Sequence, residues 1–349
     1  MLFGTIASAG VAGTAGVVIA YLLVLTGRSY YPLKGARLTH FVMHMAGGAL
    51  AAFAIVALAD ESVWKTPLLP CASMEVALPK EDHRKARRRG ALTGRAVVAA
   101  EVYNPIILRT VLPLPQWLAG RRLVSLSHRG KFLLFHWDDA SLIVVNPMLA
   151  GLFALTEPGA RRTKATAFAV TFEGDVQLRY LDEKQMGKAY LLRGEDPVQA
   201  VAGFAELGPE ADPVALDQED FVRRGRPRRL EVRNLLLDQS FLAGIGNAYA
   251  DEILFAARLH PKRKCSSLSA EEWAGLAQAT QTVIAEGVRA VDEGLPPGLG
   301  VKIRSHLKVR GRENTPCPRC GTRIVLRSLG YLETNFCPSC QPAPPGQLY

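Results

Sequence analysis

Four cysteines near the C-terminus constrain the local fold more than any other feature of this 349-residue chain. Two residues separate the cysteines within each pair, and sixteen separate the pairs. Two such pairs at the ends of a β-hairpin place four thiolates tetrahedrally around one ion, at about 2.3 Å for zinc. Four thiolates complete the coordination shell, so the ion should hold the hairpin together and should not activate water. We therefore predict one structural zinc, bound by Cys317, Cys320, Cys337 and Cys340.

The charge of the chain indicates an anionic partner. The formal net charge is +10, and residues 1–73 contribute only four basic and two acidic residues, so most of the excess lies further along the chain. Such a balance favours nucleic acid or an acidic membrane surface. The two cysteines outside the metal pairs, Cys71 and Cys265, are isolated, which is typical of a reducing compartment. We expect the protein in the cytoplasm, with the nucleoid.

Residues 1–73 are apolar enough to suggest a membrane segment. The uncharged runs 2–25 and 41–59 are each long enough to cross the roughly 30 Å hydrocarbon layer as a helix. One or two transmembrane helices, and a membrane anchor, are therefore expected. The basic residues between the runs would keep that loop in the cytosol and send both termini to the other side, where a nucleic-acid-binding domain has no use. The alternative is that Met74 is the real start of a soluble protein.

The remaining chain predicts an α+β fold. Strand-like runs separated by turn residues favour an N-terminal β-sandwich, and later helical patterns favour a helical domain. The segment 221–238 has a helical pattern, and Ser269 with Glu272 forms a capping box for a later helix. The expected divisions are a hydrophobic extension at 1–73, a β-sandwich at 74–195, a linker at 196–219, a helical domain at 220–300, a zinc hairpin at 301–341 and a tail at 342–349.

A second motif lies in residues 235–261, LLLDQSFLAGIGNAYADEILFAARLHP. Glycines at 244 and 246 break the helical pattern and allow close backbone approach. The following helix then presents its N-terminal amides and Asn247 to solvent, an arrangement that binds phosphate. By itself, the motif favours a helical hairpin packed in a core over a phosphate-binding site.

The combination of LDQSFLAGIGNAYADEILFAARLHP, HLKVRGRENTPCPRCGT and TNFCPSCQ resembles the formamidopyrimidine-DNA glycosylase/endonuclease VIII family. Upstream, RGKFLLFHW, NPMLAG, LRYLDEKQMGKAYLL and LGPEADP resemble further motifs of the same family, so the resemblance covers about residues 74–341. It implies a β-sandwich domain, a helix–two-turn–helix motif and a zinc hairpin. It also implies base-excision repair of oxidised bases in double-stranded DNA, with glycosylase and abasic-site lyase activity, by a monomer.

The implied chemistry needs the α-amine of an N-terminal proline, and this chain has no proline at the matching position. Members of the family flip a damaged base out of the duplex and attack its sugar C1′ with the α-amine of an N-terminal proline, helped by a glutamate. Here Val76 and Ala77 stand at those positions, and Lys80 replaces a second glutamate. Starting the match at Met74 recovers Glu75 but no proline.

The resemblance also assigns DNA-binding positions, and several are altered. Lys131 and Asn247 match family residues that contact DNA, whereas Asn146 replaces a histidine and Leu332 an arginine that grips phosphate. Arg323 and Arg327 could compensate in part for Leu332. The residues expected to fill the space left by a flipped base are Leu149, Gln185 and Met186.

Two main hypotheses follow. The first is a glycosylase with a rearranged nucleophile, Lys80 or Lys131, whose amine is freed by desolvation. The second is a DNA-binding module that has lost this chemistry and is tethered to a membrane; the altered proline, glutamate and arginine favour it. A third reading is a membrane protein whose soluble domain only resembles a glycosylase.

Overall fold

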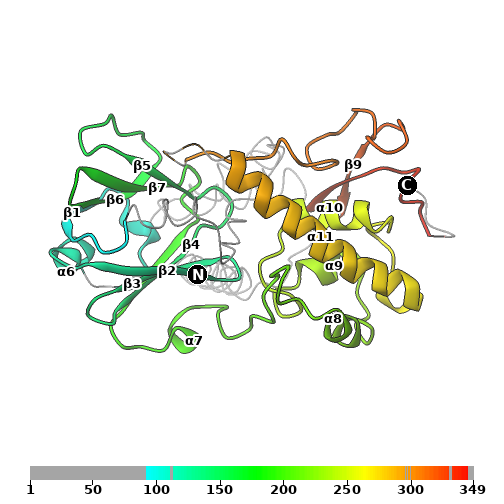
Figure 1. Ribbon diagram of the computed structural model, residues 1–349, viewed down its shortest axis with the longest axis horizontal. Helices are drawn as coiled ribbons and strands as arrows, with labels where there is room; N and C mark the ends of the chain where they lie inside the picture. The colour runs from blue at the N-terminus through cyan, green and yellow to red at the C-terminus, as the bar shows by residue number, and fades with distance from the viewer. Residues whose placement is uncertain are drawn as a thin grey trace, which may run out of the picture. The chain divides into compact units, whose positions relative to one another are not determined.

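The computed structural model describes residues 92–110, 113–294, 296, 298, 300–329 and 332–344, which belong to one compact unit, residues 69–349 (Figure 1). The predicted membrane runs 2–25 and 41–59 lie outside these ranges, as do Glu75 and Lys80. No helix within the described ranges combines the length and hydrophobicity needed to cross a membrane.

Two four-stranded antiparallel sheets form the β half of the described chain, residues 92–192, as the α+β prediction requires. The strand-like runs expected in this part of the chain form strands, and turns separate them. The first sheet has the order β1 (Val97–Val102), β6 (Thr166–Phe172), β7 (Val176–Leu181) and β5 (Leu152–Thr156). The second has the order β2 (Leu123–Arg129), β3 (Phe132–Trp137), β4 (Leu142–Asn146) and β8 (Lys188–Leu192).

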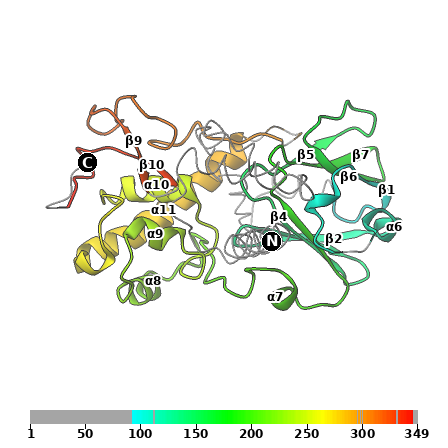
Figure 2. The same cartoon turned by 180° about the vertical axis from the view of Figure 1, so that it is seen from behind.

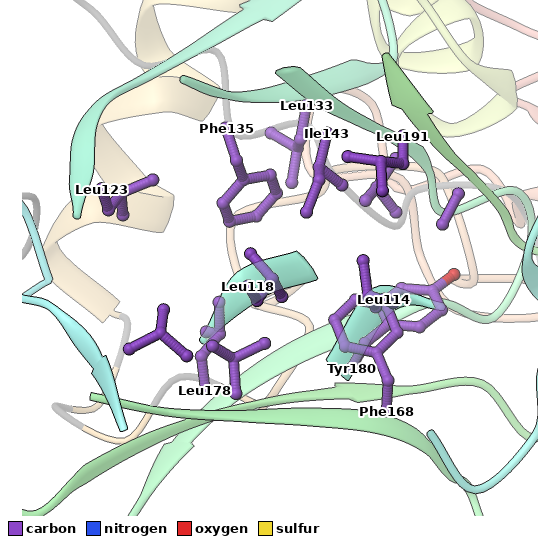
Figure 3. Packing of buried hydrophobic residues seen from close by; sticks show 14 of the residues in the cluster. Leu114, Leu118, Leu123, Leu133, Phe135, Ile143, Phe168, Leu178, Tyr180 and Leu191 are labelled. Atoms are coloured by element: carbon purple, nitrogen blue, oxygen red, sulfur yellow. The ribbon is translucent and has the colours of Figure 1, made fainter. Parts of the chain in front are cut away.

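The core of the β half lies between the two sheets, as Figure 3 shows. Because alternate side chains of a strand point to opposite faces, Leu133 and Phe135 of β3 face Phe168 and Tyr180 of the other sheet. The short helix α6 (Leu114–Leu118) adds Leu114 and Leu118, which are four residues apart and so share one helix face.

Strand β3 is apolar on both faces, and the predicted linker explains this. Phe132 and Leu134 point away from the central core and pack against buried Val201 and half-buried Phe204 and Leu207. The segment that begins with α7 (Pro197–Ala200) is thus a packed cover on the second sheet and not a free connection. A strand buried on both faces needs a continuous apolar run, which FLLFHW supplies.

The helical half, residues 216–294, forms a second core. The single helical pattern expected over 221–238 is wrong in one respect, because two helices occupy it. The first ends at Gly225, and Pro227 then interrupts the pattern because proline has no N–H with which to continue the helix. The helices are α8 (Gln218–Gly225), α9 (Val232–Leu237), α10 (Asn247–Ala256) and α11 (Ala270–Gly294).

Helix α11 begins with the predicted capping box, which is confirmed. The Ser269 N–H donates to the Glu272 carboxylate at 2.8 Å, and the Glu272 N–H donates to the Ser269 hydroxyl at 3.2 Å. The buried face of α11, including Trp273, Leu276 and Ile284, packs into the same core as α9 and α10. A two-stranded antiparallel hairpin follows, formed by β9 (Val325–Leu329) and β10 (Leu332–Phe336).

The remaining elements are short. Two 3-10 turns, η1 (Pro105–Ile107) and η2 (Cys265–Ser267), join longer elements, and η2 closes the loop after α10. Figure 2 shows β10 of the hairpin beside α10. This contact brings the two motifs that the sequence analysis singled out into one place.

Candidate nucleic-acid interface

A glutamine and a glycine shape the turn between α9 and α10. The Gln239 side-chain amide donates to the carbonyls of Leu237 and Ile245, each at 2.9 Å, and its oxygen accepts from the Gly244 N–H at 3.0 Å. Gly244 has a φ of 108°, in the left-handed region that favours glycine. The Gln239 side chain therefore holds the backbone of the turn, which fixes the position at which α10 starts with Asn247.

Asn247 is the first residue of α10 and is half-buried. Its side-chain oxygen accepts a hydrogen bond from Arg233 Nη2 at 2.9 Å. Since this oxygen is engaged by the arginine, the amide nitrogen with its two N–H groups is left for a partner outside the network. An amide donor beside the N-terminal N–H groups of a helix suits an oxyanion such as phosphate.

Arg233 belongs to a buried ionic network that ties α9 and α10 to the hairpin. Its side chain is fully buried, and its Nε donates to Asp251 at 3.1 Å. The same Nη2 that holds Asn247 also donates to the carbonyl of Glu333 in β10 at 3.0 Å. The phosphate-binding candidate and the hairpin backbone therefore share one guanidinium.

Asp251 is the second centre of this network. Its carboxylate accepts from Arg310 at 2.9 Å, from the Thr334 hydroxyl at 2.7 Å and from the Asn335 N–H at 3.0 Å. Buried charges are tolerated only when they are paired and hydrogen-bonded, and here the Asp251 carboxylate accepts from two arginines, a hydroxyl and a backbone N–H. The network fixes β10 on α10.

Glu252, the next residue of α10, holds the chain that leads into the hairpin. Its carboxylate accepts from the backbone N–H groups of Lys308, Val309 and Arg310, each at 2.9 Å. Burial raises the pKa of Glu252, although these three donors oppose the shift. Because this one carboxylate accepts three backbone N–H groups, it fixes residues 308–310 to α10, and we refer to this contact as the latch.

The four cysteines predicted to bind metal lie together beside the hairpin. All four Sγ atoms lie within 4.8 Å of one another. Cys317 Sγ is 3.9 Å from Cys340 Sγ, and Cys320 Sγ is 3.5 Å from Cys337 Sγ. A tetrahedral ion at 2.3 Å from each sulfur requires about 3.8 Å between sulfurs. Backbone N–H groups of Arg319 and Cys340 point at Cys317 Sγ and Cys337 Sγ, as expected around thiolate ligands. The four thiols can therefore hold one metal ion.

Two loops of the β half carry the residues predicted to enter DNA. Leu149 lies in the loop after β4 and is half-buried, whereas Gln185 and Met186 lie in the loop after β7 and are exposed. Asn146 begins the first loop, and its side chain accepts the Met148 N–H at 3.1 Å and so shapes the turn. The side-chain oxygen of Asn146 is therefore used within its own loop.

Tyr180 locks these two loops together. Its buried hydroxyl lies where a Cβ on Gly151, in the first loop, or on Gly187, in the second, would have to be. Asp182 reinforces the second loop by accepting the Gly187 N–H at 2.6 Å and the Lys184 N–H at 3.2 Å. Burial raises the pKa of Tyr180 above its usual value, and nearby Asp182 adds to this. The tyrosine therefore stays neutral and holds Leu149 and Met186 on adjacent loops.

Lys131 lies in the turn between β2 and β3 and is half-buried. The turn is held by Glu210, whose carboxylate accepts the Gly130 N–H at 2.8 Å and pairs with the Arg129 guanidinium. Gly130 and Glu210, together with Gly244 and Tyr249, line a cavity of about 40 Å³. Gly130, the residue before Lys131, thus lies near the turn that precedes α10, although the two are far apart in sequence.

The remaining predicted residues lie at the hairpin. Arg323 is exposed, and its backbone forms an isolated antiparallel β-bridge with Pro316, the residue before Cys317. Arg327 is exposed on β9. Leu332 is the first residue of β10, and its side chain lies outside the described part of the chain. Both arginines therefore lie on the hairpin element that the resemblance assigns to DNA.

Sequence reasoning missed the residues that orient the site. Sequence spacing does not show which site residues are held by Arg233, Asp251, Arg310 and Tyr180. The available signal was the placement of charges inside otherwise apolar helical patterns, at Arg233 in EVRNLLL and at Asp251 and Glu252 in NAYADEILF. Charges at buried positions imply partners, but the sequence does not name them.

Two family models match this chain. The formamidopyrimidine-DNA glycosylase N-terminal domain matches residues 81–189, and the formamidopyrimidine-DNA glycosylase H2TH domain matches residues 207–296. The first contains both sheets except for the last residues of β8, and the second contains α8 to α11.

Similar proteins carry the same name. The formamidopyrimidine-DNA glycosylase of Moorella thermoacetica is 34% identical over 251 residues, which cover 70% of this chain and 91% of the relative. That of Heliobacterium modesticaldum is 36% identical over 275 residues, covering 76% and 99%. Among solved structures, Lactococcus lactis Fpg in complex with abasic-site DNA matches with a TM-score of 0.67 and 25% identity, over 74% of this chain and 97% of that one.

Proposed function

This chain belongs to the formamidopyrimidine-DNA glycosylase family, and we propose that it removes damaged bases from double-stranded DNA. Similar Lactococcus lactis structures are bound to DNA with an abasic site or with Fapy-dG. These relatives favour the enzyme over a DNA-binding module that has lost its chemistry, which the substitutions at Val76 and Ala77 had favoured.

The observation that carries this proposal is the position of Asn247. It lies at the N-terminus of α10, it is oriented by buried Arg233, and it is tied through Asp251 to a metal-binding hairpin. This arrangement grips a phosphate group of DNA without reading a base, because the donors are an amide and backbone N–H groups. The grip sets the register of the duplex on the protein.

The two loops locked by Tyr180 are proposed to open the duplex. Leu149 and Met186 are apolar side chains of a size that inserts between bases and replaces a base that has been flipped out. Gln185 can hydrogen-bond to the unpaired opposite base, but it cannot offer the two-pronged donor of an arginine. Recognition of the opposite base should therefore be weaker than an arginine would make it.

The metal of the hairpin is proposed to be one zinc ion. The sulfur separations of 3.5 and 3.9 Å fit a tetrahedral zinc, and four thiolates leave no open position. Zinc would therefore supply only rigidity, holding β9 and β10 against α10. Arg323 and Arg327 are proposed to contact the backbone of the DNA from this hairpin.

Base removal requires an unprotonated amine near C1′ of the damaged nucleotide. The amine attacks C1′, and the bond from C1′ to the base breaks with its electron pair leaving on the base, which takes up a proton while the nitrogen loses one. The bond from C1′ to the ring oxygen O4′ then breaks with its electron pair going to O4′, which is protonated, and the nitrogen lone pair forms the C=N bond of a protonated Schiff base. We propose Lys131 or Lys80 as this amine, with Glu75 as a proton carrier. Lys131 is supported by its half-buried position in a turn held by Glu210.

Borohydride trapping tests this proposal. The full chain is incubated with duplex DNA containing an abasic site and is then reduced, which converts a Schiff base into a stable covalent adduct. We expect an adduct with the natural chain, and its loss in either Lys131→Met or Lys80→Met but not in both. A duplex without an abasic site is the control. If the natural chain gives no adduct while still binding the duplex, the lyase chemistry is excluded.

A further inference from the structure

A short segment after α11 crosses to the β half, as the orange part of the chain in Figure 1 shows. Gly298 and residues 300–302 of this segment are described, and we refer to these four residues as the strap. The Leu155 N–H donates to the Gly298 carbonyl at 2.8 Å, and the Gly300 N–H donates to the Phe153 carbonyl at 2.9 Å. Both partners lie on β5, the edge strand of its sheet, so the strap extends that sheet by main-chain pairing.

The strap depends on the small size of its glycines. Gly300 has a φ of 75°, and a Cβ there would lie 3.3 Å from Ala154 Cβ. A Cβ on Gly298 would lie 3.3 Å from the Leu155 carbonyl oxygen. A larger residue at position 300 is strained by its backbone conformation and is also crowded by β5. Substitution at Gly300 should therefore lift the strap from β5 without changing any charge.

Lys302, at the end of the strap, reaches the loop that carries Leu149. Its Nζ donates to the Leu149 carbonyl oxygen at 3.0 Å. This is a charge-assisted hydrogen bond at a partly buried site, and it joins residues that are 153 positions apart. Within its own loop, the nearest backbone restraint on Leu149 is the bond from the Gly151 N–H to the Pro147 carbonyl, at 2.9 Å.

The chain that continues from the strap is anchored on α10. Six residues after Lys302, the N–H groups of residues 308–310 bind the carboxylate of Glu252. Glu252 is the neighbour of Asp251, which belongs to the network around Asn247. The strap, together with residues 303–310, therefore connects the Leu149 loop to the helix proposed to bind phosphate.

We propose that the strap positions Leu149 for insertion into damaged DNA and that Lys302 is the positioning residue. The inference rests on the proposed function, because it assumes that Leu149 enters the duplex. Lys302 fixes the backbone at Leu149, and the latch at Glu252 relates that point to the phosphate grip. When a phosphate group is bound at Asn247, Leu149 then enters the base stack at a fixed distance from that phosphate along the DNA.

The test measures insertion separately from DNA binding. A duplex carries an abasic-site analogue with 2-aminopurine beside it, and unstacking by the inserted side chain raises the fluorescence of this base. The full chain is compared with Lys302→Met, Lys302→Arg and Gly300→Ala, with Leu149→Ala as the reference for lost insertion. Gly159→Ala is the matched control for Gly300→Ala, because a Cβ at Gly159 meets no atom within 4 Å.

We expect Lys302→Met and Gly300→Ala to lose at least half of the fluorescence change, while their affinity for the duplex falls by less than about threefold. Lys302→Arg should retain most of the signal because it keeps a charged donor. Thermal unfolding of each variant checks that it is folded.

Three results would overturn the proposal. If Lys302→Met and Gly300→Ala both give the full signal while Leu149→Ala does not, the strap does not position Leu149. If Leu149→Ala itself gives the full signal, the assignment of Leu149 within the proposed function fails first. If only Lys302→Met loses signal, and the slope of log affinity against log salt falls by about one, Lys302 binds a phosphate directly instead.

Discussion

At the scale of single residues, neighbours decide what the predicted site residues can do. Asn247 could point either end of its amide outward, and Arg233 settles the choice by donating to its oxygen. Tyr180 is buried and carries no charge, but its hydroxyl occupies the space that Gly151 and Gly187 leave free. In both cases, a buried side chain that makes no contact with solvent orients a residue that does.

Asn247→Asp tests the orientation of the amide. An aspartate can still accept the hydrogen bond from Arg233, so the thermal unfolding temperature should stay within a few degrees. It presents an anion where the amide donor stood, so the free energy of DNA binding should weaken by about 2 kcal/mol, or roughly 30-fold. Fluorescence anisotropy with a labelled duplex measures this.

The control for this variant is Asn234→Asp, which makes the same change at an exposed position of α9. Its affinity for DNA should fall by less than about threefold. Equal losses in the two variants would show that net charge, and not the position of Asn247, determines the effect.

His260 should make stability depend on pH. It is buried against Phe336 of β10, and burial lowers its pKa to about 4, with Lys262 adding to the effect. Because the folded state resists protonation, the unfolded state binds more protons below the ordinary histidine pKa of about 6.5, and stability falls as the pH drops from 6.5 toward 4. At pH 5.5 the expected loss is about 1.4 kcal/mol relative to pH 7.5.

Urea unfolding at the two pH values measures this loss. His260→Asn is the comparison, since an asparagine oxygen can still accept the Lys262 N–H that His260 Nδ1 accepts at 3.2 Å but cannot titrate. The difference between pH 5.5 and 7.5 should shrink by most of the predicted amount. An unchanged difference would assign the pH dependence to other groups.

At the scale of elements, the hairpin depends on two separate supports. One is the cluster of four cysteines, and the other is the network that joins Asp251 to Thr334 and Asn335. The two meet in β10, whose last residues run directly into Cys337. Loss of the metal should therefore also affect α10, because the donors of β10 to Asp251, Thr334 and Asn335, would become less ordered.

Metal removal should weaken DNA binding as well as the hairpin. With a chelator, or in Cys317→Ser, we expect the unfolding temperature to fall and the affinity for the duplex to drop at least about tenfold. Native mass spectrometry should find one zinc per chain before treatment. Cys265→Ala is the control, because Cys265 is buried away from the four clustered cysteines, and it should keep the metal. Retained affinity after metal loss would separate the hairpin from the grip on DNA.

At the scale of the whole described unit, the predicted linker joins the β half to the helical half. Glu210 binds Gly130 N–H and Arg129 of the β half, while its neighbours pair with the turn before α10. The Ala211 N–H donates to the Ala243 carbonyl at 2.9 Å, and the Ala243 N–H donates to the Pro209 carbonyl at 2.8 Å. The linker therefore fixes the two halves to each other by both side chain and backbone.

Glu210→Ala should loosen this joint. It leaves Arg129 Nη1 and the Gly130 N–H without their acceptor, while Arg129 Nη2 keeps the carbonyls of Leu207 and Gly208, so the free energy of unfolding should fall by about 1–3 kcal/mol. The preference for abasic-site DNA over undamaged DNA should also decrease, since it requires both halves in register. Calorimetry and competition binding measure the two effects. Glu206→Ala, at an exposed position four residues earlier, should change neither.

The sequence by itself determined those features that depend on local spacing. The cysteine pairs predict a site for one metal ion, the capping box predicts the start of α11, and strand-like runs separated by turn residues predict the two sheets. The motif around Asn247 predicts a helix N-terminus, and the structure places one there. Each of these depends on residues a few positions apart, whose geometry the backbone fixes.

Only the tertiary structure decided how distant residues share the site. Arg233 meets Glu333 across 100 positions, and Lys302 meets Leu149 across 153. A buried charge in the sequence shows that a partner is needed, but many residues could serve. The partner is chosen by how helices, sheets and strap pack, because a hydrogen bond forms only where packing brings donor and acceptor within about 3 Å.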